Sequence, residues 1–167
     1  MPTLAAYLES TKPRITALVV FTTAAGLWLA PVRPSLDTVL FALVGTAMVL
    51  WQVPHFLAIT LVRRREFARA GLVVQPNEPA GDREARRNIL LYTAALVAVS
   101  LMFIPLGVGG NVYLVSAVVS GALFLGHGIQ GLRSDSGERW ARTEFLRSLA
   151  YLTVLLAVLL LDRSPAL

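Results

Sequence analysis

The sequence contains no cysteine and is poor in charge. Without cysteine, a disulfide framework, thiolate chemistry and a cysteine-ligated metal are all excluded. Charged residues make up 15% of the chain, whereas a soluble domain usually carries about 25%. The sequence also shows no HExxH helix, P-loop, dinucleotide-binding fingerprint or recognisable nucleophile triad. These absences exclude the common soluble enzyme classes and favour a membrane protein.

Long apolar runs dominate the composition instead. Hydrophobic residues make up 56% of the 167 residues, and the mean hydropathy is +0.66. Several runs approach the roughly 20 residues that a helix needs to cross a hydrocarbon core of about 30 Å. The pattern predicts an all-α fold, a polytopic membrane helical bundle forming one membrane-embedded domain over residues 1–167. About five transmembrane helices are expected, over residues 15–32, 36–62, 88–109, 112–132 and 145–161.

Proline and glycine mark the connections between these helices. Pro105 is expected to kink or end the helix over 88–109. The glycine-rich stretch 107–110 predicts a tight turn into the following helix. Glu78 and Asp82 are four residues apart, but the proline and glycine between them argue against a helix. We therefore interpret these two acids as part of a solvated loop.

Basic residues gather on one side of the predicted helices. Of the 15 lysine and arginine residues, only Arg33 and Arg163 fall on the other side. The positive-inside rule therefore places the N-terminus and both long loops in the cytoplasm, and five helices then place the C-terminus outside. The net charge is +5 and the pI is near 10.4. The basic residues responsible lie between hydrophobic helices rather than on a soluble basic face. Acidic lipid headgroups or a phosphorylated substrate are therefore better partners than nucleic acid.

The stretch Trp51–Pro76, WQVPHFLAITLVRRREFARAGLVVQP, joins an apolar helix to a basic end. Adjacent guanidinium groups suit phosphate oxygens through charge-assisted, often bidentate hydrogen bonds. A carboxylate such as Glu66 can hold Mg²⁺ that bridges to substrate phosphates. The simpler interpretation is a positive-inside marker in which Glu66 pairs with an arginine three residues away. Spacing alone leaves both interpretations open for Arg63, Arg64, Arg65 and Arg69.

Isolated polar residues within and beside the apolar runs are further candidates. A histidine in a membrane span, such as His55, usually faces the bundle interior, where it ligates iron, moves a proton or bonds a neighbouring helix. Gln52 lies three residues earlier and indicates a polar interior patch on the same face. His127, between two glycines near a helix end, is expected at the membrane interface. Lys12 and Arg14 precede the first helix and are interpreted as an orienting charge pair.

Several motifs along the chain match known patterns. Residues 7–26, YLESTKPRITALVVFTTAAG, are similar to YLxLTKPRI..L....T..AG. Trp51–Pro76 is similar to WQxPHFxAxA followed by a basic-acidic-aromatic triplet and AG..(M/V)LP. Leu91–Thr93, Gly109–Tyr113 and Ala141–Leu152 match LYT, a glycine-rich turn with a tyrosine soon after, and ArxLFxxSxxYL. On these motifs nearly the whole chain resembles the protohaem IX farnesyltransferase (haem O synthase) family of intramembrane prenyltransferases.

The chain also departs from that family. The family is expected to have nine transmembrane helices and a first aspartate-rich motif, NxxxDxxxD, which binds Mg²⁺-diphosphate. This chain has room for about five helices and lacks the motif. Residues 35–49 look like the start of the family's second helix and the residues after them like the second half of its sixth, as if four helices had been excised near Thr46–Leu50. In the second acidic motif, Glu66, Phe67 and Val73 stand where the family commonly has Asp, Tyr and Pro.

The resemblance implies a reaction: transfer of a farnesyl group from farnesyl diphosphate to the vinyl group of protohaem IX, impaired by loss of the first aspartate-rich motif. The alternatives are a non-catalytic membrane module that binds haem or isoprenoid or serves in assembly, and an incomplete gene model. The implied location is the cell (inner) membrane of a bacterium. The implied partners are the two substrates, the lipid bilayer, and either a second copy of the chain in a homo-oligomer or haem-copper oxidase assembly factors.

The resemblance also implies roles for individual residues. Glu66 would be the Mg²⁺ ligand and would act in catalysis with Arg64 and Arg65. The diphosphate-binding residues would be Lys12, Arg14, Arg64, Arg65 and Arg69, and the haem-binding residues would be His55, Trp51 and Gln52. This assignment requires the guanidinium groups of residues 63–65 to face a cavity that connects with His55.

Overall fold

The structure is a computed structural model that describes residues 35–71, 74, 81–133 and 137–162. The helix expected over 15–32, together with Lys12 and Arg14, lies outside these residues. Each element within them is an α-helix. The helices are α3 (Leu36–Val62), α4 (Arg64–Arg69), α5 (Gly81–Leu101), α6 (Asn111–Arg133) and α7 (Glu138–Leu161).

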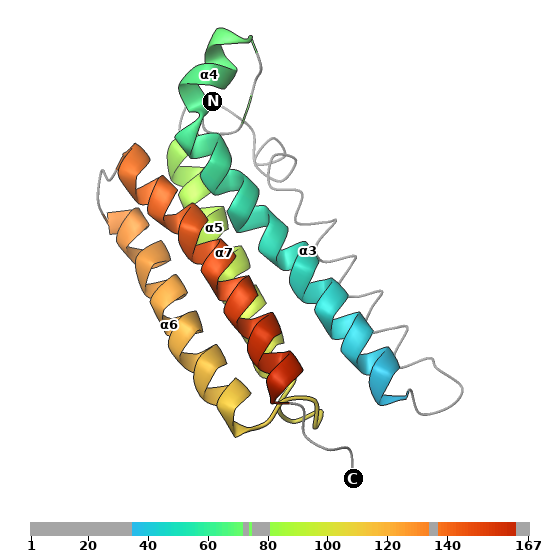
Figure 1. The fold of residues 1–167 in the computed structure, drawn as a ribbon. Helices are drawn as coiled ribbons and strands as arrows, with labels where there is room; N and C mark the ends of the chain where they lie inside the picture. Colours follow the sequence, from blue (N-terminus) through green and yellow to red (C-terminus); the bar gives the residue numbers. More distant parts are fainter. Residues whose placement is uncertain (1–34, 72–73, 75–80, 134–136, 163–167) are drawn as a thin grey trace.

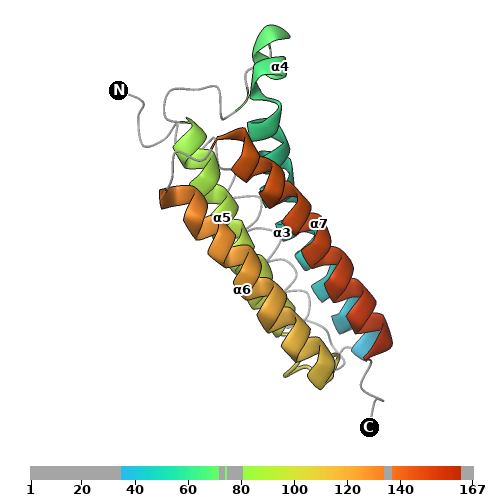
Figure 2. The same ribbon diagram turned by 60° about the vertical axis from the view of Figure 1, so that its left-hand side comes forward.

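The long helices α3, α5, α6 and α7 form an antiparallel bundle, shown from two sides in Figures 1 and 2. α3 packs against α5 and α7, and α6 packs against the same two helices. Figure 1 shows the ends of α3 and α6 and the starts of α5 and α7 at the upper end of the bundle, where α4 also lies. The basic segment of α4 and the charged first turns of α5 and α7 therefore share one end of the molecule.

α3 has the bounds that the apolar pattern predicts over 36–62. It begins after Ser35, whose side chain accepts a hydrogen bond from the Thr38 amide at 3.3 Å and so caps the helix. Pro54 lies inside the helix and is buried. The helix is continuous through Thr46–Leu50, so the join between the two family-like segments lies within one helix.

α5 and α7 both begin earlier than expected. α5 begins at Gly81 rather than at 88 and ends at Leu101 rather than at 109. The interpretation of Asp82 as part of a solvated loop is wrong, because it lies in the first turn of α5. α7 begins at Glu138 rather than at 145. In both helices the added turns carry charged residues, which a search for apolar runs excludes.

The connection from α5 to α6 is a series of turns, as the proline and glycines predict. Pro105 lies beyond the end of α5, within these turns. Gly107 has φ of 72°, a left-handed conformation that favours glycine. Its amide bonds the Ile104 carbonyl at 2.9 Å, and the Gly110 amide bonds the Asp162 carbonyl at 3.2 Å. The first bond closes the turn itself, and the second ties the turn to the end of α7.

Three of the described helices, α3, α6 and α7, are long and apolar enough to cross a membrane. α5 differs because its first two turns are charged, although ten of its residues are buried and recur at helical spacing. α6 approaches α5 closely: a methyl group on Gly121 would lie 2.9 Å from a Val97 methyl. The fold is thus an all-α membrane bundle, with α5 as its most enclosed helix.

Candidate functional site

The basic segment after α3 lies at the solvent-exposed end of the bundle. Arg63 and Glu66 form an ion pair at 3.7 Å, with 63% and 70% of their side chains exposed. This is the pairing at three residues that the simpler interpretation predicts. Arg65 and Arg69 are also exposed. The exposed guanidinium groups can reach a phosphorylated ligand, but the described residues do not enclose one around them.

Arg64 is tied to the bundle through Asp82. Its Nη1 lies 3.4 Å from Asp82 Oδ1, and Arg86 Nε lies 2.8 Å from Asp82 Oδ2. Arg86 is buried: it donates to the Gly131 carbonyl at 3.0 Å, and its guanidinium lies 5.1 Å from the centre of the Trp140 ring. Asp82 therefore joins an exposed arginine on α4 to a buried arginine on α5.

His55 and Trp51 lie together on the face of α3 that packs against α7. Their rings stack with centroids 4.4 Å apart. His55 Nδ1 lies 2.9 Å from Ser148 Oγ, and Trp51 Nε1 donates to the Ser148 carbonyl at 2.7 Å. Gln52 is exposed, so the structure does not place it with the other two residues predicted to bind haem. The Phe145 ring also packs against His55, with centroids 4.7 Å apart and the two ring planes tilted by 31°.

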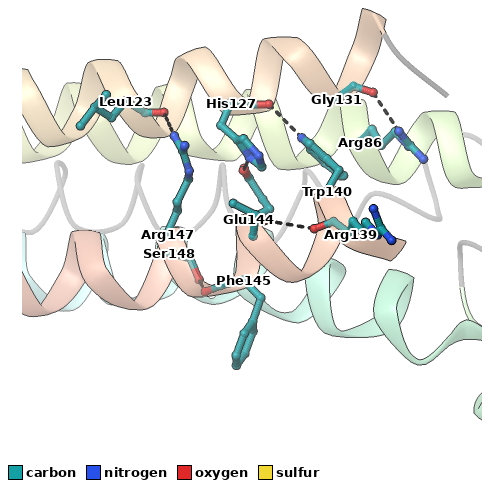
Figure 3. Close-up of polar contacts among 11 residues, drawn as sticks. Arg86, Leu123, His127, Gly131, Arg139, Trp140, Glu144, Phe145, Arg147 and Ser148 are labelled. Carbon is teal, nitrogen blue, oxygen red and sulfur yellow. Dashed lines mark hydrogen bonds and ion pairs between the residues drawn. The ribbon is translucent and has the colours of Figure 1, made fainter. Parts of the chain in front are cut away.

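The interior of the bundle holds a polar pair that sequence reasoning missed. His127 is buried between helices of the bundle, and its expected position at the membrane interface stays a prediction. Its Nδ1 lies 2.5 Å from Oε2 of Glu144, whose side chain is 0% exposed. The Trp140 indole stacks on His127 and donates to the His127 carbonyl at 2.9 Å, as Figure 3 shows. Arg147, one turn further along α7, donates to the Leu123 carbonyl at 2.8 Å.

Two signals could have identified this pair. Trp140, Glu144 and Ser148 recur every four residues along α7, which is the spacing of one buried helix face. The ArxLFxxSxxYL pattern also has leucine at the position of Glu144. A carboxylate at an apolar position of a membrane helix usually faces the bundle interior and has a partner there.

The described residues do not form a protein-only Mg²⁺ site. No group of three or more histidine, aspartate or glutamate side chains within them could hold a metal ion. Glu66 contributes a single carboxylate, which pairs with Arg63. Mg²⁺ is often bound by one or two carboxylates together with substrate phosphates. Glu66 therefore fits such an ion only together with a bound diphosphate.

The site requirement derived from the sequence is a cavity that connects the basic segment with His55. His55 precedes Arg63 by eight residues, about 12 Å along the helix axis. A cavity near the other end of the bundle is lined mainly by apolar residues of α3, α5 and α7, among them Met48, Leu96 and Leu155. A second, open cavity lies at the start of α7 around Trp140. Neither cavity is lined by His55 or by the basic residues of α4.

Comparison with known proteins gives the wider context. The protoheme IX farnesyltransferase of Sorangium cellulosum (strain So ce56) is 50% identical over 119 residues, 71% of this chain and 42% of that protein. The protoheme IX farnesyltransferase of Myxococcus xanthus (strain DK1622) is 46% identical over 118 residues, 71% of this chain and 40% of that protein. That of Thiobacillus denitrificans is 44% identical over 112 residues, 67% of this chain and 37% of that protein.

The chain spans about two-fifths of the length of these curated relatives. No solved structure matches it. The family model described as the UbiA prenyltransferase family matches residues 14–150, well over half of the chain. With three helices that could cross a membrane, this chain is an integral membrane protein that belongs to the UbiA prenyltransferase family.

Proposed function

We propose that this chain carries a haem O synthase-like site for transfer of a farnesyl group from farnesyl diphosphate to a vinyl group of protohaem IX. The observation that carries the proposal is the joint match to relatives named protoheme IX farnesyltransferase. The geometry supports it in one respect: His55 and the basic segment lie on consecutive helices of one continuous stretch, with the arginines accessible at its end.

In this reaction the C–O bond of farnesyl diphosphate breaks, and diphosphate leaves with the bonding electrons. The vinyl group attacks the farnesyl carbon and forms a C–C bond. Water then adds to the resulting cation and loses a proton, which leaves the hydroxyethylfarnesyl group. The protein would contribute mainly by stabilising the negative charge that develops on the departing diphosphate. Arg64, Arg65 and Arg69 would do so through charge-assisted hydrogen bonds. In this proposal Lys12 and Arg14 would bind the diphosphate at the same cytoplasmic end.

Glu66 would hold Mg²⁺ jointly with the diphosphate, and the ion would neutralise charge on the leaving group. His55 and Trp51 would line the side that faces protohaem, and Gln52, to which the resemblance also assigns this role, is exposed. His55 already bonds Ser148 through Nδ1, so in this proposal Ser148 fixes the orientation of the imidazole. Trp51, stacked on His55, would extend the same aromatic surface.

We further propose that this chain alone turns over slowly. The NxxxDxxxD motif is absent from the sequence, and the single carboxylate of Glu66 cannot hold two Mg²⁺ ions as an acidic cluster would, which leaves more of the diphosphate charge without a counter-ion. The second candidate is a non-catalytic module that binds haem, alone, as a homo-oligomer or with assembly factors. The bond from His55 to Ser148 favours it, because a polar contact between α3 and α7 serves a binding module equally well.

The proposed location is the inner membrane of a bacterium with the N-terminus in the cytoplasm and the C-terminus outside. The supporting observation is that α4 and the charged first turns of α5 and α7 share one end of the bundle. Positive charge at one membrane face is the arrangement that the positive-inside rule describes. Farnesyl diphosphate would then reach the arginines from the cytoplasmic side.

The experiment is an assay of the purified full chain with haem B, farnesyl diphosphate and Mg²⁺ in lipid nanodiscs, with haem O measured by mass spectrometry. We expect the unchanged chain to form a trace of haem O and the Arg65→Gln variant to form none. Robust turnover would contradict the proposed impairment. A haem absorption shift that His55→Ala removes, with no haem O at any enzyme concentration, would favour the non-catalytic module. Absence of both haem binding and diphosphate binding would overturn both candidates.

A further inference from the structure

Asp82 lies between two guanidinium groups that come from different helices. Its Oδ1 is 3.4 Å from Arg64 Nη1 on α4, and its Oδ2 is 2.8 Å from Arg86 Nε on α5. Each carboxylate oxygen thus contacts one arginine. A phosphate group presents oxygens of the same kind and charge, and arginine pairs bind both anions through the same N–H groups.

Arg86 has a fixed position. Only 10% of its side chain is exposed, and two further contacts hold its guanidinium: the Gly131 carbonyl at 3.0 Å and the Trp140 ring at 5.1 Å. Figure 3 shows Arg86 reaching across to the end of α6. A buried guanidinium needs an anion beside it, since its desolvation is otherwise uncompensated. Arg86 will therefore retain an anion at its Nε.

The other two members of the group remain accessible to solvent. The side chains of Arg64 and Asp82 are 45% and 36% exposed, and the contact between them is the longer of the two. An exposed ion pair at this distance is weak and exchanges readily with anions from solution. The arrangement thus combines a fixed, buried cation with a replaceable anion and a second, accessible cation.

We propose that Arg64 and Arg86 form a phosphate subsite that Asp82 occupies as an internal competitor. A phosphate of the ligand displaces the Asp82 carboxylate and bridges the two arginines. Nothing in the resemblance or in the proposed function assigns Arg86 or Asp82 to the site. The inference rests on the proposed function, because it deepens the description of the same diphosphate-binding end of the molecule.

Two sources can supply the phosphate: a prenyl diphosphate, or the headgroup of an anionic phospholipid at the membrane surface. Both offer the same oxygens to the same guanidinium groups. Inorganic pyrophosphate is the probe for the first source, since it lacks the prenyl chain and reports on the charged end alone. Phosphatidylglycerol is the probe for the second.

The test is a calorimetric titration of the full chain with pyrophosphate, in phosphatidylcholine nanodiscs and without divalent cations. Asp82→Asn removes the competing charge and is expected to tighten pyrophosphate binding about two- to fivefold, the range for one exposed ion pair. In an Arg64→Gln background, the same substitution should produce no such gain. Asp82→Glu keeps the carboxylate and should leave the affinity close to that of the unchanged chain.

Glu138→Gln is the matched control. Glu138 also forms an ion pair with an arginine four residues away, Arg142, at 3.2 Å. If Glu138→Gln tightens binding as much as Asp82→Asn, net charge explains the effect and the subsite is overturned. Weaker binding by Asp82→Asn overturns it as well. If Asp82→Asn does not fold, the pyrophosphate affinities of Arg64→Gln and Arg63→Gln are compared instead. Equal losses of affinity overturn the subsite, and a larger loss for Arg64→Gln supports it.

The same titrations distinguish a failure of the subsite from a failure of the proposed function. If the unchanged chain binds pyrophosphate through Arg65 and Arg69 but Asp82→Asn brings no gain, only the subsite is wrong. If neither the unchanged chain nor Asp82→Asn binds, both are wrong. The titration is then repeated in nanodiscs containing phosphatidylglycerol. If pyrophosphate binding weakens there, and weakens more for Asp82→Asn than for the unchanged chain, the subsite belongs to a lipid headgroup. Unchanged binding there assigns it to a free diphosphate, and both results support the subsite.

Discussion

The charged end of the bundle and its polar interior differ in how their side chains are paired. At the charged end, Arg63 and Glu66 are mostly exposed and lie 3.7 Å apart. In the interior, Glu144 is fully buried, and its Oε2 lies 2.5 Å from His127. A glutamate paired with a basic residue therefore has a different role in each region. The exposed charges remain available to a ligand, whereas the buried pair specifies how α6 packs on α7. Four predictions test this difference.

The largest effect is expected for His127→Leu. It leaves the buried Glu144 carboxylate without its partner, and Oε1 of Glu144 already has no hydrogen-bond partner within the described residues. We expect the free energy of unfolding to fall by about 3 kcal/mol, the upper end for a buried unsatisfied group. Unfolding in mixed micelles, followed by circular dichroism, measures it.

The double substitution His127→Leu with Glu144→Leu is the control for that prediction. It removes both polar groups, so part of the lost stability should return, as with other buried pairs replaced by apolar residues. A double variant no more stable than His127→Leu alone would show that volume rather than pairing sets the effect.

Gly131→Ala is expected to cost about 2 kcal/mol, because overpacking in a filled interior displaces its neighbours. A Cβ at Gly131 would run into the Trp140 indole, which bonds the His127 carbonyl. Gly126→Ala, on the same helix, is the matched control: a Cβ there meets nothing within 4 Å. It should be neutral or stabilising, since alanine is the better helix former. Equal thermal unfolding of the two variants would contradict the packing at Trp140.

Ser148→Ala should cost about 1 kcal/mol, because it removes the hydrogen bond between α7 and His55 Nδ1 together with the one that the same hydroxyl donates to the Phe145 carbonyl of its own helix at 2.7 Å. The bond from Trp51 goes to the Ser148 carbonyl and should remain. Ser120→Ala is the control, since the Ser120 hydroxyl bonds a carbonyl of its own helix. Chemical unfolding of both variants measures the difference. If Ser120→Ala costs as much, the contact between α3 and α7 contributes nothing specific.

The sequence was sufficient to predict the all-α membrane bundle and the bounds of α3, and the pairing of Glu66 with an arginine three residues away was one of two interpretations that it left open. Apolar length and the i,i+3 spacing determine these features locally. The early starts of α5 and α7 could not be predicted from apolar runs, because charged turns are unfavourable in lipid but are stabilised here by partners on other helices. Arg86 depends on the Gly131 carbonyl and the Trp140 ring, more than forty residues away. Such tertiary contacts leave no local pattern.

The smallest effect is expected at the exposed pair. In a double-mutant cycle of Arg63→Gln and Glu66→Gln, the coupling energy should be below about 0.5 kcal/mol, as for exposed pairs on one helix. The pair lies at the start of α4, a helix with no buried residue, where solvent screens both charges. A coupling above 1 kcal/mol would mean that the charged end is as tightly organised as the interior. With weak coupling, any large loss of Mg²⁺-dependent diphosphate binding in Glu66→Gln reflects lost ligand contacts, because the fold does not depend on this carboxylate.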